Sequence, residues 1–210
     1  MLDSRRTDPA RRSPTSRRHR DPARRRGRDV TARARAVRLL VLDVDGVLTD
    51  GRMLLSERGD ELKAFHSHDG LAIGLAQRAG LRVALMTGEK SAVAQARAAR
   101  LGVEDVVLGA RRKGEALADL AARYDLPLSQ VAFMGDDLLD VPALERAGLA
   151  LAPANAVPEA RAAAHRVTRA AGGAGAVREG VEWILRAQGR WREVVTAFLR
   201  EHGGTGRPGR

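Results

Sequence analysis

The feature that most constrains the fold is a repeating order of short apolar runs and amphipathic stretches, which begins at Val37. The first run, Val37–Val44, consists of Val and Leu and is interrupted only by Arg38 and Asp43. A short apolar run that ends in Asp and Gly is typical of a buried strand in a parallel sheet. Similar runs follow at Leu81–Met86, Val103–Leu108, Val131–Met134 and Leu149–Leu151.

Amphipathic stretches of helical period separate these runs. They span Leu71–Ala79, Ala92–Leu101, Gly114–Tyr124 and Val141–Ala147. Strands that alternate with helices predict the α/β class, with a doubly wound, Rossmann-like parallel sheet. In such sheets ligands bind at the carboxyl ends of the strands. We therefore expect the functional residues to follow directly after the apolar runs.

One segment departs from this alternation. Arg52–Ser56 and Glu61–Phe65 read as the two arms of a β-hairpin with Gly59 in its turn. The hairpin is too short for a separate lid, so the sequence predicts a flap and no cap domain. Asp69 is expected to be the N-cap of the helix that follows.

The distal part of the chain adds further elements. We expect a short helix at Val157–Ala164, a last strand at His165–Arg169, a loop at Gly172–Gly175 and a final helix at Ala176–Gln188. Two interpretations stay open for Trp191, Val194 and Phe198: they extend that helix, or they dock elsewhere.

The net charge of +11 is concentrated at the start of the chain. Residues 1–36 hold 13 Arg against 4 Asp, whereas the remainder is nearly neutral. So few large apolar residues lie in this stretch that it is predicted to be a disordered tail. A polyanion-binding arm remains open as an interpretation, but a solvated extension, or an upstream stretch from a mis-chosen start codon, is favoured. No aromatic residue is interleaved to stack on bases, which weighs against nucleic acid as a partner.

Composition excludes several other classes of protein. The chain has no cysteine, so a disulfide framework, a thiolate zinc site and a cysteine nucleophile are excluded. No apolar run approaches the roughly 20 residues that a membrane span needs, and Met1–Arg6 lacks the apolar stretch of a secretory signal. We expect a cytoplasmic protein with no membrane partner, one folded domain at residues 37–200 and a frayed C-terminus at residues 201–210.

Two clusters of carboxylates follow two of the predicted strands. Asp43 and Asp45 flank one Val, so their side chains point to the same side of an extended segment. The second cluster comprises Asp136, Asp137 and Asp140. Carboxylates this close repel one another unless a cation or a shared proton intervenes, and oxygen-only ligation suits Mg²⁺. Helix caps and solvated turns explain any one of these acids alone, but two clusters at matching strand ends favour a Mg²⁺ site.

Four motifs now stand in order along the chain. They are Asp43–Thr49, Thr87, Lys113 and Gly135–Asp140. In this order and spacing they resemble the four motifs of the haloacid dehalogenase superfamily of phosphotransferases. The resemblance implies a phosphoric monoester hydrolase that uses Mg²⁺ as its cofactor.

The resemblance also implies a role for each acidic residue of the first motif. Asp43 would attack phosphorus and form an aspartyl-phosphate. Asp45 would protonate the leaving alkoxide and then deprotonate the hydrolytic water. Mg²⁺ would bind the Asp43 carboxylate, the Asp45 backbone carbonyl and Asp136, where it would neutralise phosphoryl charge.

The remaining motifs would support this chemistry. Thr87, with nearby backbone N–H groups, would hold phosphoryl oxygens. Lys113 would supply positive charge to the nucleophile and the phosphate. Asp137 or Asp140 would orient Lys113 or a metal-bound water.

Within the superfamily, the sequence from Val37 to Gln188 is similar to the cap-less branch of 3-deoxy-D-manno-octulosonate 8-phosphate phosphatases. The segments that carry this similarity are Asp50–Gly51, Gly59–Phe65, Asp69–Gly70, Gly135–Asp140, Val167–Arg169 and Gly172–Glu179. Members of this branch are homotetramers in which the flap hairpins assemble and a neighbouring subunit helps to cover the open site. The resemblance therefore implies a homotetramer, because a chain without its own lid needs some cover to exclude water.

The same resemblance implies where the sugar acid binds. The expected substrate contacts are His66, Ser67, His68, Asp69 and Gly70 in the loop after the flap, Gly88 and Glu89 after the second motif, and Arg97 on the following helix. Histidine as a metal ligand is not expected here, because no second cluster of soft ligands accompanies His66 and His68.

This chain departs from the branch at two places. Relatives carry Arg where this chain has Glu89, and they carry Asn and Arg where it has His66 and His68. Replacing a cation by an anion beside an anionic sugar acid disfavours binding. The leading hypothesis is a phosphatase of a 2-keto-3-deoxy sugar acid phosphate of the 3-deoxy-D-manno-octulosonate 8-phosphate type.

Three alternatives stay open at this point. The first is a phosphatase of another small phosphorylated metabolite, such as a nonulosonate 9-phosphate, which Glu89 permits. The second is a non-catalytic oligomerisation domain, although the presence of Asp43, Asp45, Lys113 and Asp136 argues against it. The third makes the arginine-rich tail primary and the protein nucleic-acid-associated.

Overall fold

The structure is a computed structural model that describes residues 22–206, with backbone only for residues 22–28. Six parallel strands form its central sheet, in the order β5-β4-β1-β6-β7-β8. The strands are β1 (Leu39–Leu42), β4 (Arg82–Met86), β5 (Asp105–Val107), β6 (Val131–Met134), β7 (Leu149–Ala152) and β8 (Arg166–Val167). The doubly wound, Rossmann-like parallel sheet expected from the sequence is confirmed.

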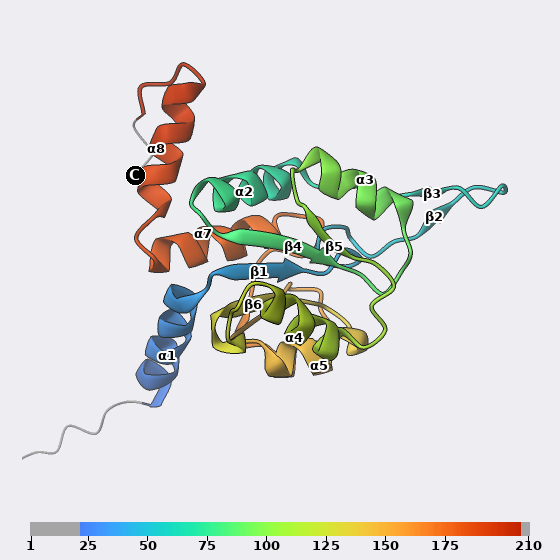
Figure 1. Cartoon of the computed structure of the whole chain (residues 1–210), viewed down its shortest axis with the longest axis horizontal. Coiled ribbons are helices and arrows are strands. Elements are labelled where there is room, and N and C mark those ends of the chain that lie inside the picture. The colour runs from blue at the N-terminus through green and yellow to red at the C-terminus, as the bar shows by residue number, and fades with distance from the viewer. Residues whose placement is uncertain (1–21, 207–210) are drawn as a thin grey trace, which may run out of the picture.

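Helices cover both faces of this sheet (Figure 1). One side carries α2 (Ser67–Arg78), α3 (Ala92–Arg100) and α7 (Ala176–Ala187), and the other carries α4 (Lys113–Arg123), α5 (Val141–Arg146) and α6 (Pro158–Ala163). Leu40 and Leu42 belong to the core on the first side, whereas Leu39 and Val41 belong to the core on the second. This alternation explains why the first strand is apolar throughout: both of its faces are buried.

The strand order places the chemistry at one edge of the sheet. From β1 the chain winds outward through β4 and β5, then returns to β6 on the other side of β1. The crevice beside such a switch point, at the carboxyl ends of the strands, is where open α/β sheets bind ligands. Asp43 follows β1, Thr87 follows β4 and Gly135 follows β6. Two 3₁₀ turns complete this half of the fold, η1 (Leu128–Gln130) and η2 (Leu138–Asp140).

The predicted hairpin is present and projects from the body (Figure 1). Its strands, β2 (Leu54–Leu55) and β3 (Glu61–Leu62), pair antiparallel. Gly59 lies in the turn with φ +82°, a left-handed conformation that favours glycine. The hairpin leaves apolar side chains in solvent, since Leu55 and Leu62 are each 66% exposed.

The expectation of a disordered tail is wrong for residues 22–36, which form helix α1 (Pro22–Ala36). Ala34 is fully buried, and Val30 packs against the same core. Arg33 Nη1 donates to the carbonyl of Gly148 at 2.8 Å. The composition argument missed this helix because it counted apolar residues and ignored their spacing, which places Val30, Ala34 and Val37 on one helical face. The expected disorder of residues 1–21 lies outside the described residues.

The C-terminal part holds one helix more than expected. Gly189, with φ +74°, ends α7, and the chain starts again as α8 (Trp191–Glu201). Trp191 is buried at the start of this separate helix, so it does not extend the previous one. Residues 202–206 lie outside regular structure, and the rest of the expected frayed end is outside the described residues. Among the described helices, none has the length and apolar character needed to cross a membrane.

Candidate active site

The site is centred on a buried lysine that joins two carboxylates. Lys113 is the first residue of α4, and its Nζ lies 2.7 Å from Oδ1 of Asp43 and 2.6 Å from Oδ1 of Asp140. All three residues are at least 95% buried. Asp43 is fixed at the end of β1 because its backbone N–H continues the sheet ladder to the carbonyl of Met134 at 3.0 Å. The structure thus brings together residues from three of the four sequence motifs.

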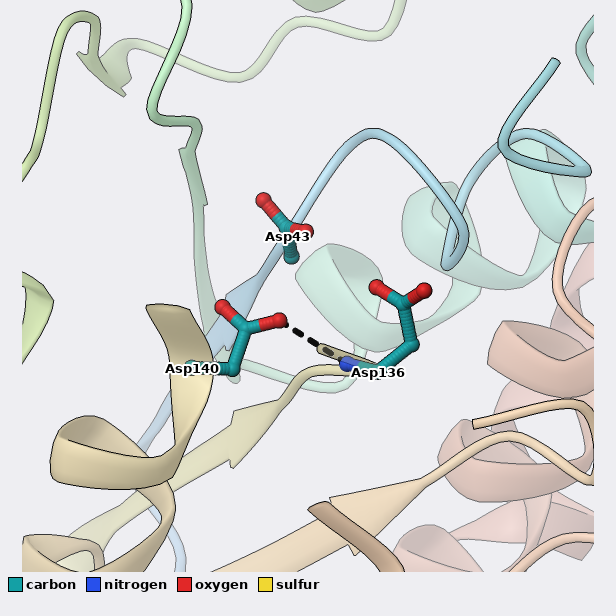
Figure 2. A group of neighbouring side chains, drawn as sticks. All are labelled: Asp43, Asp136 and Asp140. Carbon is teal, nitrogen blue, oxygen red and sulfur yellow. Dashed lines mark hydrogen bonds between the residues drawn. The ribbon is translucent and has the colours of Figure 1, made fainter. Parts of the chain in front are cut away.

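Asp140 holds the loop after β6 in shape. Its Oδ2 accepts hydrogen bonds from the backbone N–H groups of Asp136, at 2.9 Å, and Asp137, at 3.1 Å. Figure 2 shows the Asp140 carboxylate pointing toward the backbone N–H of Asp136, with the Asp43 side chain above it. With Lys113 on its other oxygen, Asp140 has both carboxylate oxygens occupied. It therefore supports its neighbours and has little capacity left for a cation.

Asp43, Asp136 and Asp140 form a cluster of carboxylates that could hold a metal ion. One carboxylate oxygen of each lies within 4.8 Å of the others. Among the described residues, buried Asp136 Oδ1 has no hydrogen-bond partner, and a buried acceptor of this kind is costly unless something binds it. The donor set is oxygen only, which fits a hard divalent cation such as Mg²⁺. The residues present thus fit the predicted cofactor, with Asp43 and Asp136 as its carboxylate ligands.

Electrostatics favour the same conclusion. Burial raises the pKa of Asp43 to about 8, and the Asp140 carboxylate adds to this rise while Lys113 opposes it. Burial also raises the pKa of Asp136 to about 7, together with repulsion from Asp140 and Asp137. Both carboxylates are therefore poorly stabilised as anions by the protein alone. A divalent cation would supply the missing positive charge.

Two of the predicted acids, Asp45 and Asp137, do not belong to the cluster of Asp43, Asp136 and Asp140. Asp45 lies outside the three-carboxylate cluster, and its Oδ1 is 2.5 Å from Nζ of Lys63. Asp137 is exposed and accepts the backbone N–H of Leu138 at 2.6 Å, so it caps η2. Of the two acids expected to orient Lys113, the structure brings only Asp140 to it.

Lys63 is the residue that sequence reasoning missed. It lies in the segment Gly59–Phe65, which carried the family resemblance but was given no chemical role. The sequence held one indication of this role. In an extended strand Glu61 and Lys63 point to the same side, so the pattern was compatible with an ion pair that faces the site. Which face points inward could not be known without the structure.

The second motif forms the opposite wall. Thr87 is buried at the end of β4, and its Oγ1 accepts the backbone N–H of Glu89 at 3.1 Å. Gly88 lies between them, in contact range of the Leu139 side chain. Glu89 is exposed and lies 3.6 Å from the Arg111 guanidinium, a solvent-screened pair of opposite charge.

The expected sugar-acid loop holds two polar groups that lack partners. His66 Nδ1 and Arg97 Nε are both buried and have no hydrogen-bond partner in the part of the chain that the structure describes. The His66 and His68 rings meet edge to face with centroids 4.9 Å apart. Arg97 passes so close to Gly70 that a Cβ at Gly70 would lie 2.5 Å from its Nη2. Ser67, in the same loop, is the first residue of α2 and is exposed.

Asp69 is not the N-cap of α2, since that position belongs to His66. Asp69 is 1% exposed and accepts backbone N–H groups of Gly175, at 3.2 Å, and Arg178, at 2.7 Å. The sequence argument failed because the side chain turns away from its own helix and satisfies the start of α7. Both of its oxygens are used there, so we now expect Asp69 to hold α7 in place.

The glycine-rich loop before α7 packs onto the turn that follows Asp43. A Cβ at Gly172 would lie 1.7 Å from the carbonyl oxygen of Gly46, and a Cβ at Gly173 would lie 2.5 Å from the Thr49 carbonyl carbon. The Gly173 N–H also donates to the carbonyl of Val47 at 3.0 Å. Only glycine allows backbones to approach so closely. This packing supplies the role for residues 172–175 that sequence motifs alone left open.

Comparison with known proteins places this geometry among phosphatases. Residues 100–178 match the family model of haloacid dehalogenase-like hydrolases. Over 166 residues the chain is 44% identical to 3-deoxy-D-manno-octulosonate 8-phosphate phosphatase KdsC of Escherichia coli strain K12. The aligned region covers 79% of this chain and 88% of that protein.

Solved structures agree with the sequence comparison. 3-Deoxy-D-manno-octulosonate 8-phosphate phosphatase from Moraxella catarrhalis, solved with magnesium, phosphate and KDO, superposes with a TM-score of 0.79 at 35% identity, over 81% of this chain and 98% of that one. A probable YrbI family phosphatase from Pseudomonas syringae pv. phaseolica gives a TM-score of 0.79 at 43% identity, over 82% and 98%.

We predict that stabilisation by Mg²⁺ grows with pH. With the pKa values of Asp43 and Asp136 at about 8 and 7, the folded protein retains protons that the unfolded chain loses near pH 4. Stability without metal therefore falls as pH rises from about 4 to about 8, while Mg²⁺ binding, which requires the ionised carboxylates, strengthens. Thermal unfolding with and without Mg²⁺ should show a larger shift in Tm at about pH 8.5 than at about pH 6.

Two variants control this measurement. Asp136→Asn should lose most of the Mg²⁺-dependent shift, whereas Asp119→Asn, an exposed carboxylate on α4, should retain it. An equal shift in Tm at both pH values would contradict the electrostatic account.

Proposed function

The chain belongs to the 3-deoxy-D-manno-octulosonate 8-phosphate phosphatases of the haloacid dehalogenase-like hydrolases, and we propose that it is a Mg²⁺-dependent phosphatase of a phosphorylated 2-keto-3-deoxy sugar acid. The observation that carries the proposal is the buried Asp43, held by Lys113 in one cluster with Asp136, whose buried Oδ1 has no partner among the described residues. This arrangement supplies a nucleophile, a cation and a metal site within one pocket.

In the first step, the free carboxylate oxygen of Asp43 attacks phosphorus and forms an acyl-phosphate bond. The bond between phosphorus and the sugar oxygen breaks, and Asp45 gives a proton to that oxygen. In the second step, Asp45 takes a proton from water as the water attacks phosphorus. The bond from phosphorus to Asp43 then breaks, and inorganic phosphate and the free carboxylate result.

Lys113 and Thr87 hold the reacting groups. Lys113 fixes one oxygen of Asp43 by its 2.7 Å contact and leaves the other for attack. Thr87, buried on the adjacent strand end, offers its hydroxyl to a phosphoryl oxygen. Asp43, Asp136 and the backbone carbonyl of Asp45 would hold Mg²⁺, which when bound neutralises part of the phosphoryl charge.

The sugar-acid end of the substrate is assigned to the loop after the hairpin. His66 Nδ1 and Arg97 Nε are buried and unpaired, so a ligand carboxylate or hydroxyl would satisfy groups that otherwise cost free energy. Arg97 suits a carboxylate in particular because its guanidinium offers paired donors. These two residues, with Ser67, His68, Gly70 and Gly88 around them, are the proposed substrate contacts.

Glu89 favours a second candidate substrate within the same chemistry. The side chain is exposed at the wall formed by the second motif, where it repels an anionic sugar acid. Arg111 at 3.6 Å reduces this repulsion but is itself 68% exposed. The alternative is therefore an ester that places a hydroxyl or a cationic group, and not its carboxylate, near Glu89, such as a nonulosonate 9-phosphate or another small phosphomonoester. A non-catalytic oligomerisation domain is disfavoured by the intact Asp43–Lys113–Asp140 contacts.

We also propose that the protein is a cytoplasmic homotetramer assembled through the hairpin. The hairpin leaves Met53, Leu54, Leu55 and Leu62 between 50% and 66% exposed, a cluster that is disfavoured in water unless a partner covers it. Leu138 and Leu139 are exposed beside the carboxylate cluster, at 61% and 47%, and would be covered in the same way. The cytoplasmic location rests on the family resemblance.

We predict that Asp43→Asn abolishes turnover and leaves the fold intact. The amide has the shape of the carboxylate but cannot attack phosphorus, so phosphate release from 3-deoxy-D-manno-octulosonate 8-phosphate should fall by at least about 10³-fold. Mg²⁺-dependent phosphate release and circular dichroism measure the two properties. Asp119→Asn is the matched control, and turnover retained in Asp43→Asn would remove the nucleophile assignment.

We predict that Glu89→Arg raises kcat/KM on 3-deoxy-D-manno-octulosonate 8-phosphate by about tenfold, because a charge-assisted contact replaces a repulsion worth about 1.4 kcal/mol. Steady-state kinetics on that substrate measure the effect. Glu145→Arg makes the same change of charge on the exposed side of α5 and should have no effect. If Glu89→Arg instead loses activity, Glu89 recognises a different substrate and the second candidate gains.

We predict that Leu55→Asp lowers the oligomeric state. A charge at the centre of the apolar hairpin surface would be buried by assembly at a cost of several kcal/mol, which the dimer or tetramer contact cannot offset. Light scattering coupled to gel filtration should give a tetramer for the wild type and for Arg58→Asp, at the hairpin turn, but a smaller species for Leu55→Asp. A tetramer for all three proteins would contradict assembly through this surface.

A further inference from the structure

A chain of polar contacts leads from the hairpin into the active site. Lys63 Nζ lies 2.5 Å from Oδ1 of Asp45 and 2.8 Å from Oε1 of Glu61. The other oxygen of Glu61, Oε2, accepts the Ser91 hydroxyl at 2.7 Å. Ser91 is the N-cap of α3, where its Oγ accepts the backbone N–H of Ala94. The hairpin is thus tied both to Asp45 and to the helix that carries Arg97.

The burial of Lys63 is unusual for such an exposed element. Every residue from Gly51 to Asp60 is exposed, yet the side chain of Lys63 has no accessible surface. Lysine is seldom fully buried unless it is paired, and burying an ammonium group costs free energy that its contacts must offset. The position of Lys63 is explained by what it contacts, which is Asp45.

We propose that Lys63 is a positioning residue for Asp45, so that the hairpin forms part of the catalytic machinery. This inference rests on the proposed function, in which Asp45 transfers protons to the leaving oxygen and from water. Lys63 fixes Oδ1 of Asp45 and leaves Oδ2 to face the scissile bond. Proton transfer depends steeply on the placement of the acid, and a misplacement of about 1 Å can cost about 10²-fold in rate.

Glu61 completes the arrangement by orienting Lys63. Its two oxygens hold Lys63 on one side and Ser91 on the other, so the ammonium cannot turn toward solvent without losing a contact. Because Ser91 begins α3, any displacement of the hairpin would move Asp45 relative to Arg97. These contacts thereby fix the position of Asp45, the proton donor, relative to Arg97, the proposed sugar-acid contact.

The proposal predicts that loss of Lys63 slows the first step for a sugar phosphate but not for an ester with a good leaving group. A sugar oxygen leaves only if it receives a proton, whereas p-nitrophenolate is stable enough to leave without one. Formation of the aspartyl-phosphate from p-nitrophenyl phosphate therefore needs no positioned acid. Hydrolysis of the aspartyl-phosphate still needs Asp45 as the base, whichever ester was the source of the phosphoryl group.

The test is Lys63→Met, which keeps the length of the side chain and removes the charge. On 3-deoxy-D-manno-octulosonate 8-phosphate, kcat should fall by about 10²-fold with KM nearly unchanged. With p-nitrophenyl phosphate, stopped flow should show a burst of p-nitrophenolate about equal to the enzyme concentration, followed by slow release. Lys63→Arg, which retains a cation, should recover part of the loss.

A double-mutant cycle separates positioning from a general loosening of the fold. If Lys63 acts through Asp45, the double variant Lys63→Met with Asp45→Asn should be no slower than Asp45→Asn alone. Arg58→Met, which removes a cation from the same hairpin at its exposed turn, should keep the wild-type rate. Equal losses on both esters without a burst, additive losses in the cycle, or no loss at all would overturn the proposal.

Failure of this inference is distinct from failure of the proposed function. A wild-type protein without Mg²⁺-dependent phosphatase activity on either ester would overturn the function itself. An active wild type whose Lys63→Met variant behaves like Arg58→Met would leave the function standing and remove only the role of Lys63.

Discussion

The site depends on one interaction, the buried contact of Lys113 with Asp43 and Asp140. Two carboxylates in this apolar setting would repel each other, and burial alone raises the pKa of Asp43. Lys113 offsets part of that cost and at the same time joins β1, α4 and the loop after β6. Removing one member of such a group leaves an uncompensated buried charge, which is more damaging than replacing the whole group. The fold and the chemistry therefore depend on the same three residues. The strand order brings Lys113, Asp43 and Asp140 together, and because one ammonium group faces two carboxylates, a further cation is favoured nearby.

Much of this arrangement could be predicted from the sequence, for definable reasons. Val37–Val44 is apolar on both faces, which only a buried parallel strand explains, and the structure confirms such a strand at Leu39–Leu42. The acids that follow the strands were predicted to converge because carboxyl ends of parallel strands share an edge. That Asp43 and Asp136 lie together is a consequence of topology. The hydrogen-bond partner of each acid could not be predicted, because it depends on side-chain geometry that sequence spacing does not contain. Asp140 binds Lys113, whereas Asp137 accepts the backbone N–H of Leu138.

Where the sequence reasoning failed, a tertiary contact replaced a local one. Asp69 has the position of a helix cap but bonds the start of α7, more than 100 residues away. The arginine-rich segment before Val37 looked too polar to fold, yet Ala34 and Val30 bury one helical face against the body. Lys63 lies in an exposed hairpin and still reaches the active site. In each case a partner distant in the sequence, which the local pattern does not contain, determined the outcome.

The packing of Gly172 and Gly173 against the turn at Gly46 has a consequence for how the enzyme is made. The nucleophile and its turn are translated well before the loop that supports them and before the helix that Asp69 holds. Domains fold as their chains emerge during synthesis, and contacts between distant residues form late. A ribosome-bound chain that has not yet reached Arg178 lacks the support of its own catalytic turn. The active site is thus complete only after residues 172–178 have been translated, so nascent fragments that end at Asp140 would lack the support of the catalytic turn.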